Sequence, residues 1–415
     1  MKTVKKIVAA LLCAVLMLAC FAGCHGKDAV VATVTLDKKE YTLPSGLYLT
    51  MLINADSEAR GKVTEAFEEK DKDTEDINFA KQTVTADDKK EYKFNDYVVM
   101  RAKEMVAEYL VTAYMFDKFD LKLSDENKNA MEQYVAYQWA YNGNAYLFEP
   151  NGVSYDSFED YMRVNMYYRS DIFDYFYNEG GEKAPEKKDI EKALKENFTA
   201  ANVLEISVKG EDGKDLAEDE LKAIADKIEA YCTRINEGEA TFADIKAEYE
   251  AETKKDEDKK DEDSTSSTED KKDEDSTSST EDKKDEDKED DEPKPKDENA
   301  TVIGSSETSV ASDLFKDVSE AEVGKAVLLK GTDGYYRLVI NQDILADEYY
   351  YTTYRDETVR IMHAEDFNDF IAKEAGKLKI TYDSYELDYL KPQKINYDQF
   401  NQWYSDMMNS YSTQQ

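Results

Sequence analysis

Histidine and cysteine are scarce in this chain of 415 residues, and their scarcity excludes several kinds of site. The only histidines are His25 and His363, so a metal centre that needs several imidazole ligands is excluded. Three of the four cysteines lie within the first 24 residues, and the fourth is Cys232. If the first segment is removed and modified, as argued below, no second thiol remains for an internal disulfide. We expect Cys232 to be a buried, unreactive thiol, and we predict no metal and no cofactor.

Positive charge is scarce relative to negative charge. Lys and Arg total 54 against 92 Asp and Glu, which gives a formal net charge of -38. A nucleic-acid-binding protein needs a basic face, so we exclude nucleic acid as a partner. The HExxH, GxSxG, P-loop and CxxC motifs are also absent. Their absence argues against a zinc protease, an α/β-hydrolase, a P-loop nucleotidase and a thioredoxin-type oxidoreductase.

Long apolar runs are limited to one, from Ile7 to Ala22, and it is short for a membrane span. Three lysines precede it, as in a secretory signal. Its end, Phe21-Ala22-Gly23-Cys24, resembles a bacterial lipobox. We therefore predict that residues 1–23 are a lipoprotein signal peptide. A diacylglyceryl group on Cys24 would then anchor the chain at the outer face of the bacterial cell membrane. Ordinary secretory cleavage beside a chance cysteine is the alternative.

A low-complexity acidic segment interrupts the chain between Lys254 and Lys296. The twelve letters KKDEDSTSSTED occupy Lys259–Asp270 and are repeated over Lys271–Asp282. The segment has no aromatic or aliphatic side chain whose burial would offset the entropy of ordering. We predict that residues 252–299 form a disordered acidic insert. Cation binding and a spacer role in the cell wall are the functional alternatives to a solvated insert.

Residues 24–198 predict a helical domain with an aromatic-rich core. A strand is expected at Val30–Leu36, a turn at Lys38–Tyr41 and a helix from Ser45 to about Ala55. The highly charged segment Glu65–Glu91 is expected as a loop or a frayed helix. Apolar residues recur at steps of three and four from Phe94 to Phe119, which predicts a long helix. Ser124 and Ser157 precede acidic residues and are expected to cap the next helices. We expect most Tyr, Phe and Met side chains in the core, but a surface patch of them would hold unfolded chains.

Residues 199–345 predict a small α/β domain that the acidic insert divides. The expected order is strand, helix, helix and hairpin. Its elements are Asn202–Val208, Ala217–Asn236, Thr241–Tyr249, Glu322–Leu329 and Tyr335–Asn341, with a short turn of helix at Ser312–Phe315.

This arrangement resembles a parvulin-type prolyl isomerase domain. Four segments carry the likeness: Val203–Val208, Phe242–Tyr249, Val323–Val327 and Gly334–Val339. The helical region before it resembles the N-terminal part of the PrsA/SurA-type extracytoplasmic foldases. Residues 346–390, with Phe367–Ile371 and Lys379-Ile380, resemble the helix and strand that return from the parvulin domain. A polar, aromatic tail follows over residues 391–415.

The resemblance implies an α+β fold. It consists of a helical chaperone-like domain, completed by the C-terminal helix, and a small parvulin-like domain. The function that it implies is that of a membrane-anchored extracytoplasmic chaperone or foldase. Its partners would be unfolded or partly folded exported proteins.

The residues that catalyse prolyl isomerisation are replaced. Active parvulins carry one histidine in the first strand and another in the last, beside a polar residue. Glu205 and Tyr336 stand at those positions here. His363 lies beyond the domain and is expected to be an ordinary helix-surface residue. We therefore expect peptidyl-prolyl isomerase activity to be weak or lost. An active isomerase, and a solute-binding or cell-wall-associated lipoprotein, are the alternatives.

Overall fold

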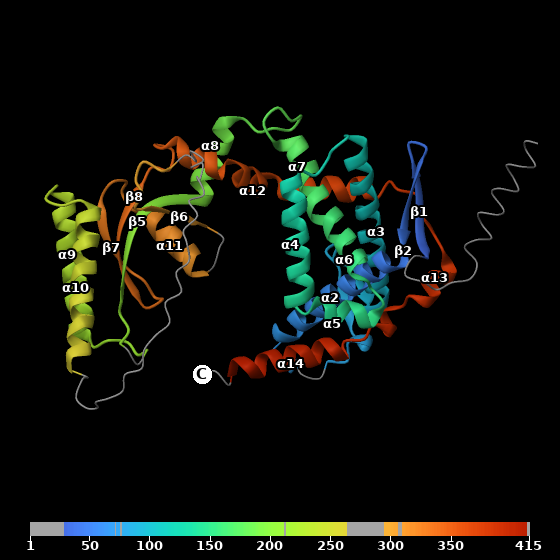
Figure 1. Ribbon diagram of the computed structural model, residues 1–415, viewed down its shortest axis with the longest axis horizontal. Helices are drawn as coiled ribbons and strands as arrows, with labels where there is room; N and C mark the ends of the chain where they lie inside the picture. Colours follow the sequence, from blue (N-terminus) through green and yellow to red (C-terminus); the bar gives the residue numbers. More distant parts are fainter. Residues whose placement is uncertain are drawn as a thin grey trace, which may run out of the picture. The chain divides into compact units, whose positions relative to one another are not determined.

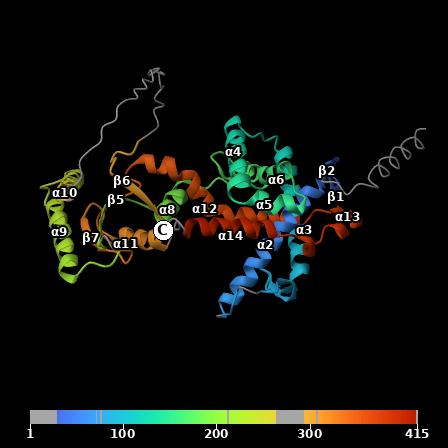
Figure 2. The ribbon, with the colours of Figure 1, turned by 60° about the horizontal axis from the view of Figure 1, so that its bottom comes forward.

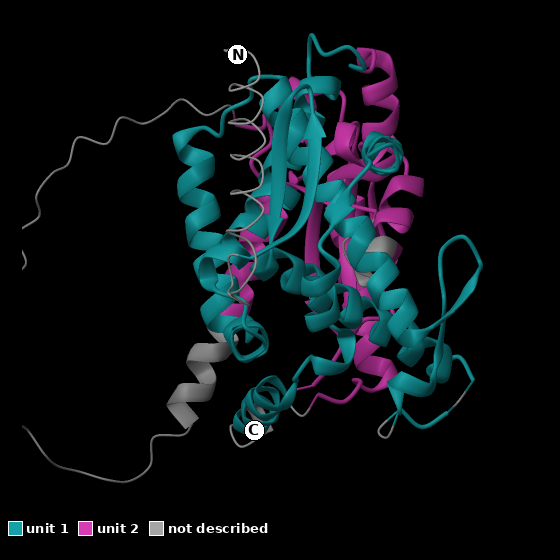
Figure 3. Ribbon diagram, turned by 90° about the vertical axis from the view of Figure 1, so that its right-hand side faces the viewer, with its two compact units in different colours: residues 1–184, 363–415 teal, residues 185–362 magenta. Residues whose placement is uncertain are grey.

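The computed structural model describes residues 29–70, 72–74, 77–210, 213–263, 294–305 and 309–412. They form two compact units (Figure 3). Unit 1 takes the described residues up to Ala184 and from His363 onward, and unit 2 takes those from Pro185 to Met362. Helices predominate, and the strands form small antiparallel sheets. The expected α+β class is confirmed.

Unit 1 begins with a β-hairpin of β1 (Val30–Leu36) and β2 (Lys39–Pro44). Asp37 and Lys38 form its tip, both with positive φ, as a two-residue hairpin loop requires. The expected turn at Lys38–Tyr41 is correct only at Lys38, because the chain has reversed by Lys39 and continues as a strand. On its other edge β1 pairs with β9 (Thr381–Tyr382), just beyond the strand expected at Lys379-Ile380.

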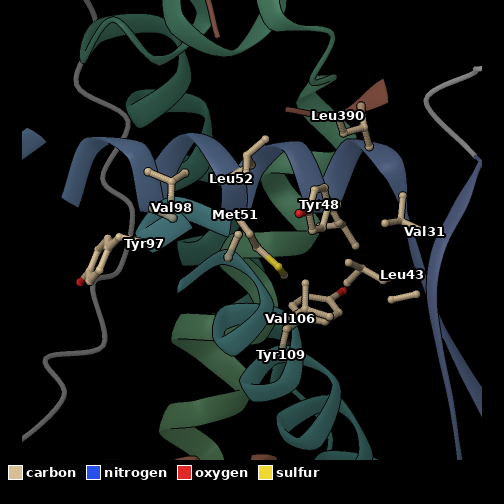
Figure 4. Packing of buried hydrophobic residues seen from close by; sticks show 14 of the residues in the cluster. Val31, Leu43, Tyr48, Met51, Leu52, Tyr97, Val98, Val106, Tyr109 and Leu390 are labelled. Atoms are coloured by element: carbon tan, nitrogen blue, oxygen red, sulfur yellow. The ribbon is translucent and has the colours of Figure 1, made fainter. Parts of the chain in front are cut away.

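The core of unit 1 is built on two long helices, α2 (Ser45–Glu68) and α3 (Phe94–Lys118). α3 confirms the helix expected at Phe94–Phe119. α2 extends well past Ala55, because Ala59 and Val63 continue its buried stripe. Figure 4 shows side chains of both helices and of the hairpin meeting in one cluster. It includes Val31, Leu43, Tyr48, Met51, Leu52, Val98, Val106 and Tyr109.

Shorter elements surround this pair. The segment expected as a loop contains η1 (Phe79–Lys81), β3 (Thr83–Thr85) and β4 (Glu91–Lys93). After α3 come α4 (Asp125–Tyr141), α5 (Asn144–Phe148), η2 (Glu149–Asn151), α6 (Tyr155–Met162), the π-helical turn η3 (Arg163–Tyr168) and α7 (Arg169–Tyr177).

The two expected serine caps have different outcomes. The Ser124 hydroxyl accepts a hydrogen bond from the Asn127 backbone N–H at 3.0 Å and caps α4, as predicted. The cap of α6 is Ser154, and Ser157 lies inside the helix and donates its N–H to the Ser154 hydroxyl. The prediction at Ser157 is wrong because Ser154 and Ser157 both precede acidic residues, so this signal does not distinguish the cap from a residue in the first turn.

The C-terminal tail docks on unit 1. It forms α13 (Ser384–Tyr389), η4 (Pro392–Lys394) and α14 (Asp398–Ser412). α14 packs along α5 (Figure 1, Figure 2). Trp403 stacks on Tyr146 with ring centroids 6.0 Å apart. Trp403 also covers Gly143, where a Cβ atom would lie 2.4 Å from the indole.

Unit 2 contains a four-stranded antiparallel sheet in the order β6–β5–β8–β7. Its strands are β5 (Phe198–Ser207), β6 (Ala300–Gly304), β7 (Ala326–Lys330) and β8 (Tyr335–Gln342). Figure 1 shows α9 (Glu218–Asn236) and α10 (Phe242–Asp263) on one side and α11 (Ser309–Glu320) on the other. Leu204 and Leu338 pack toward α9 and α10, whereas Val203 and Val339 pack toward α11.

Three features of unit 2 differ from expectation. α10 continues past Tyr249 through Asp263, so the predicted disorder of residues 252–299 is wrong for its first part. Lys and acidic residues favour helix there, and Lys227 pairs with Glu252 at 2.5 Å. β6 was not expected, because a five-residue strand depends on pairing with β5. α11 is a full helix of 12 residues. Residues 264–293 of the expected insert lie outside the described residues.

The division between the units also differs from the expected boundaries at 198/199 and 345/346. α8 (Lys187–Asn197) and the first half of α12 (Glu348–Ala375) belong to unit 2. The reason is a shared apolar cluster in which Leu194 of α8, Phe198 of β5 and Tyr350 of α12 are buried.

The docking of α14 predicts the effect of adding one methyl group at Gly143. We expect Gly143→Ala to displace Trp403, because the new Cβ would overlap the indole and the backbone φ is +74°. In a Trp139→Phe background, Trp403 is the only tryptophan. Its emission should shift to the red and become more accessible to acrylamide.

Gly180→Ala is the matched control for this variant. Gly180 has φ +86° but no neighbour within 4 Å of an added Cβ. It should cost about 1–2 kcal/mol of backbone strain and leave Trp403 emission unchanged. An equal change of emission in both variants would contradict the docking of α14 through Gly143.

Candidate functional site

Glu205 and Tyr336, the two positions expected to correspond to parvulin histidines, lie on neighbouring strands but on opposite faces of the sheet. Glu205 of β5 is paired with Arg337 of β8, and Tyr336 is paired with Ile206. Successive side chains of a strand point to opposite faces, so Glu205 and Tyr336 diverge. Tyr336 packs with the cluster beneath α9 and α10, whereas Glu205 is on the other face. The structure therefore does not bring these two residues together.

Glu205 takes part in an ion-pair triad instead. Arg337 has only 6% of its side chain exposed. Its Nε donates to Glu205 Oε1 at 2.6 Å, and its Nη1 donates to Asp333 Oδ1 at 3.0 Å. Hydrogen bonds from Arg337 lower the pKa of Asp333, which remains ionised at neutral pH. The triad fastens the turn between β7 and β8 to the sheet and occupies one of the positions expected for catalysis.

The other residues singled out from the sequence lie elsewhere. Cys232 is buried in α9, and burial raises the pKa of its thiol to about 11, as expected for an unreactive cysteine. His363 is half-buried in α12, where its ring stacks on Tyr177 with centroids 4.7 Å apart. His363 Nδ1 lies 3.4 Å from Asp366 Oδ2, so this histidine is a packing residue rather than a free surface residue. Cys24 lies outside the described residues.

Unit 1 carries a row of aromatic side chains at its surface, which we call the aromatic surface. It consists of the exposed Tyr134, Tyr137 and Tyr141 of α4 and Tyr146 of α5, together with the half-buried Trp403 of α14. Tyr141 is 71% exposed and Tyr137 is 54% exposed. Their rings stack on each other with centroids 5.4 Å apart. Tyrosines at steps of three and four lie on one side of α4, and Trp403 extends the row over Gly143 and Tyr146.

The tyrosines of α4 are exposed because this helix contributes few side chains to the core. Only Met131 and Val135 of this helix are buried. The tyrosines are displaced around the helix from this narrow stripe, and they remain outside when the stripe packs. Other aromatic residues of unit 1, such as Phe148 and Phe158, are buried in the core. An exposed group of large aromatic side chains is typical of a surface that binds another chain.

The sequence predicts a surface patch of this kind but does not locate it. The helical period is the same for a core stripe and for an exposed stripe, so spacing alone cannot separate them. The available signal is the short apolar stripe of α4 together with tyrosines outside it. The contribution of Trp403 depends on the docking of the tail, which local sequence does not encode.

Comparisons with known proteins add no identification. No protein-family model matches the chain, and no curated protein matches it. Among the described residues, no helix combines the length and apolar character needed to cross a membrane. Within the same residues, no group of three or more His, Cys, Asp or Glu side chains is placed to hold a metal ion.

The triad predicts a pH-dependent contribution to stability. The lowered pKa of Asp333 means that its stabilisation is fully present above the ordinary aspartate pKa of about 4 and is lost as pH falls through the lowered value. Asp333→Asn should therefore lower the free energy of unfolding at pH 7 by about 1–3 kcal/mol. The deficit should shrink below pH 4. Urea unfolding followed by circular dichroism measures both values.

Asp226→Asn is the control for this variant. Asp226 forms an exposed pair with Lys222 at 2.6 Å in the same unit, and such pairs contribute about 0–1 kcal/mol. A deficit for Asp333→Asn that is the same at pH 7 and pH 3 would argue against the ionised triad.

Proposed function

We propose that this chain is a membrane-anchored extracytoplasmic chaperone that holds unfolded segments of exported proteins, with prolyl isomerase activity weak or lost. The aromatic surface is the observation that carries the proposal. Tyrosine and tryptophan offer large apolar area, a polar tip and few rotatable bonds, so they contact varied unfolded segments at a small entropic cost. The stacked pair of Tyr137 and Tyr141 presents such area without a deep, shape-specific pocket.

The charge of the chain supports the same role. The formal net charge is -38. Strongly negative chaperone molecules repel one another, and this repulsion opposes aggregation while a client is bound. Glu132 is exposed on the same helix as the tyrosine row and adds negative charge there.

The organisation of unit 2 supports the resemblance to a parvulin domain. A strand, two helices and a closing hairpin follow in the expected order, with β5 and β8 adjacent in an antiparallel sheet. The likeness to PrsA/SurA-type foldases is the basis for expecting exported clients. The lipobox-like segment that ends at Cys24 is the basis for the proposed anchoring outside the cell membrane.

The geometry of unit 2 argues against efficient isomerisation. The barrier to rotation about a peptide bond is about 18–20 kcal/mol. An enzyme lowers it with polar groups that converge on the twisting bond in a desolvated site. Glu205 and Tyr336 lie on opposite faces, and Glu205 is held by Arg337. Neither position supplies an imidazole.

The aromatic surface predicts a loss of holding activity in a double variant. Tyr137→Ser with Tyr141→Ser should weaken client binding about tenfold, because removing two aromatic anchors forfeits at least about 1.4 kcal/mol. The measurement is light scattering by a reduced or heat-unfolded client, with the full chain in lipid nanodiscs at near-stoichiometric ratios.

The matched control replaces two tyrosines of similar exposure on α13. Tyr385→Ser with Tyr389→Ser changes residues that are 64% and 49% exposed, outside the aromatic surface. This control should suppress aggregation as well as the unchanged chain does. Equal activity of the two double variants would mean that the aromatic surface does not bind clients.

The separation of Glu205 and Tyr336 predicts an absence of catalysis. The full chain should leave the cis-to-trans relaxation of proline peptides at its uncatalysed time of about 10–100 s, whatever residue precedes proline. A protease-coupled assay measures this rate. Acceleration that Glu205→Gln or Tyr336→Phe abolishes would show that unit 2 is an active isomerase.

A further inference from the structure

Unit 1 contains a second feature suited to binding, a cavity of about 840 Å³. Its walls come from the β3–β4 turn, from α3, from the start of α7 and from the C-terminal half of α12. These walls are held together by packing, since Phe173 of α7 meets Phe367 of α12 edge to face with ring centroids 5.3 Å apart. The volume lies within the range of about 300–1,000 Å³ that is typical of ligand sites.

Two arginines enter the cavity, and carboxylates already bind both of them. Arg101 Nε donates to Glu58 Oε2 at 3.0 Å, and Arg101 Nη1 lies within 3.4 Å of Glu104 and Glu108. Arg169 Nη1 donates to Glu108 Oε2 at 3.3 Å, and its Nη2 donates to Asn368 Oδ1 at 2.9 Å. The guanidinium groups therefore organise the wall and are not available to an anionic ligand.

The π-helical turn η3 directly precedes Arg169 in the wall of the cavity. This turn is wider than an α-helical turn, and Arg169 follows it directly. The Asn165 side-chain amide donates to the Tyr161 carbonyl at 3.1 Å within the distorted stretch. Such insertions are frequent at functional sites. Arg169, the first residue after this turn, pairs with Glu108 of α3 at 3.3 Å.

Negative charge exceeds positive charge around the cavity. Lys62 and Lys90 pair with Asp87 and Asp88, and these hydrogen bonds lower the pKa of both carboxyl groups, so these four charges cancel. The excess comes from Glu58, Glu104, Glu108 and Asp369, which outnumber Arg101 and Arg169. Glu104, which lines the cavity, has half of its side chain exposed. A cation is the occupant that this excess of carboxylates favours.

The remaining wall suits an aliphatic chain that carries the cation. Met100, Ala107 and Ala372 supply apolar surface, and the small alanine side chains leave room. Tyr92 and Tyr97 also line the cavity, and tyrosine rings attract ammonium and guanidinium groups. Lysine and arginine side chains combine an aliphatic stem with a charged head and match both features.

We propose that this cavity binds a lysine or arginine side chain of an extended client segment. The inference rests on the proposed function and adds to it a substrate preference, for unfolded segments that combine apolar residues with positive charge. The aromatic surface then holds the apolar part of a client, and the cavity selects the cationic residue.

Fluorescence anisotropy of labelled peptides tests this preference directly. Three extended peptides share one apolar sequence and differ only in two positions, which are Lys, Gln or Glu. With the full chain in nanodiscs, the Lys peptide should bind at least tenfold more tightly than the Gln peptide, and its affinity should fall as salt rises. Equal affinity for the Lys and Gln peptides would overturn the proposal.

Isosteric variants assign the effect to the cavity. Glu104→Gln with Asp369→Asn removes two carboxylates and should weaken binding of the Lys peptide at least fivefold. The control, Asp120→Asn with Glu365→Gln, makes the same change of charge at exposed positions outside the cavity. It should have less than a twofold effect. Equal losses in the two double variants would indicate general charge attraction and would overturn the cavity assignment.

Two further measurements separate this inference from the proposed function. Competition with 1,5-diaminopentane tests whether the cavity recognises a cationic side chain within a peptide or any small amine. If 1,5-diaminopentane displaces the labelled Lys peptide at the same concentration as unlabelled Lys peptide does, the cavity is a site for free amines instead. Tyr137→Ser with Tyr141→Ser should impair suppression of aggregation while the Lys-over-Gln preference persists. Aggregation suppression without that preference overturns only the cavity. The preference without suppression overturns only the chaperone role.

Discussion

The packing of α2 against α3 is the contact on which the rest of unit 1 depends. Their shared stripe buries Met51, Leu52 and Val98 completely, and the hairpin of β1 and β2 closes over it. Because this pair supplies most of the core, α4 needs only Met131 and Val135 to attach. Its tyrosines are then left outside. One face of α3 also faces the cavity with Arg101, Glu104 and Glu108. Core, aromatic surface and cavity thus follow from a single helix pair.

The sheet of unit 2 imposes a constraint of a different kind. Alternation along β5 and β8 assigns each side chain to one face, and the register places Glu205 opposite Arg337. The order of strand, helices and closing hairpin is therefore compatible with an arrangement in which Glu205 and Tyr336 diverge. Arg337 bonds Glu205 of β5 and Asp333 of the β7–β8 turn, and these ion pairs hold the hairpin against the sheet. Holding clients does not require convergent catalytic groups, so this arrangement is consistent with the role proposed for unit 1.

Local patterns in the sequence predicted the elements whose stability is local, and missed those that depend on distant partners. α3 and the Ser124 cap follow from apolar spacing and an N-cap oxygen. β6 needs β5 to form, and the docking of α14 needs the bare backbone of Gly143 beneath Trp403. The identity of Glu205 and Tyr336 could be read from motifs, but their opposite faces required the register. The cavity is lined by residues of α3, α7 and α12, which are far apart in the sequence, so no sequence motif predicts it.

The central claim is that the aromatic surface contacts unfolded clients, and site-specific photo-crosslinking tests it most directly. Benzoylphenylalanine replaces Tyr141 in one variant and Tyr385 in another, both of them exposed tyrosines of unit 1. Each full chain is irradiated with a reduced client and with the same client in its native state. The account predicts crosslinks from position 141 to the reduced client only, and few from position 385. Equal yields from both positions, or crosslinks to the native client, would contradict it.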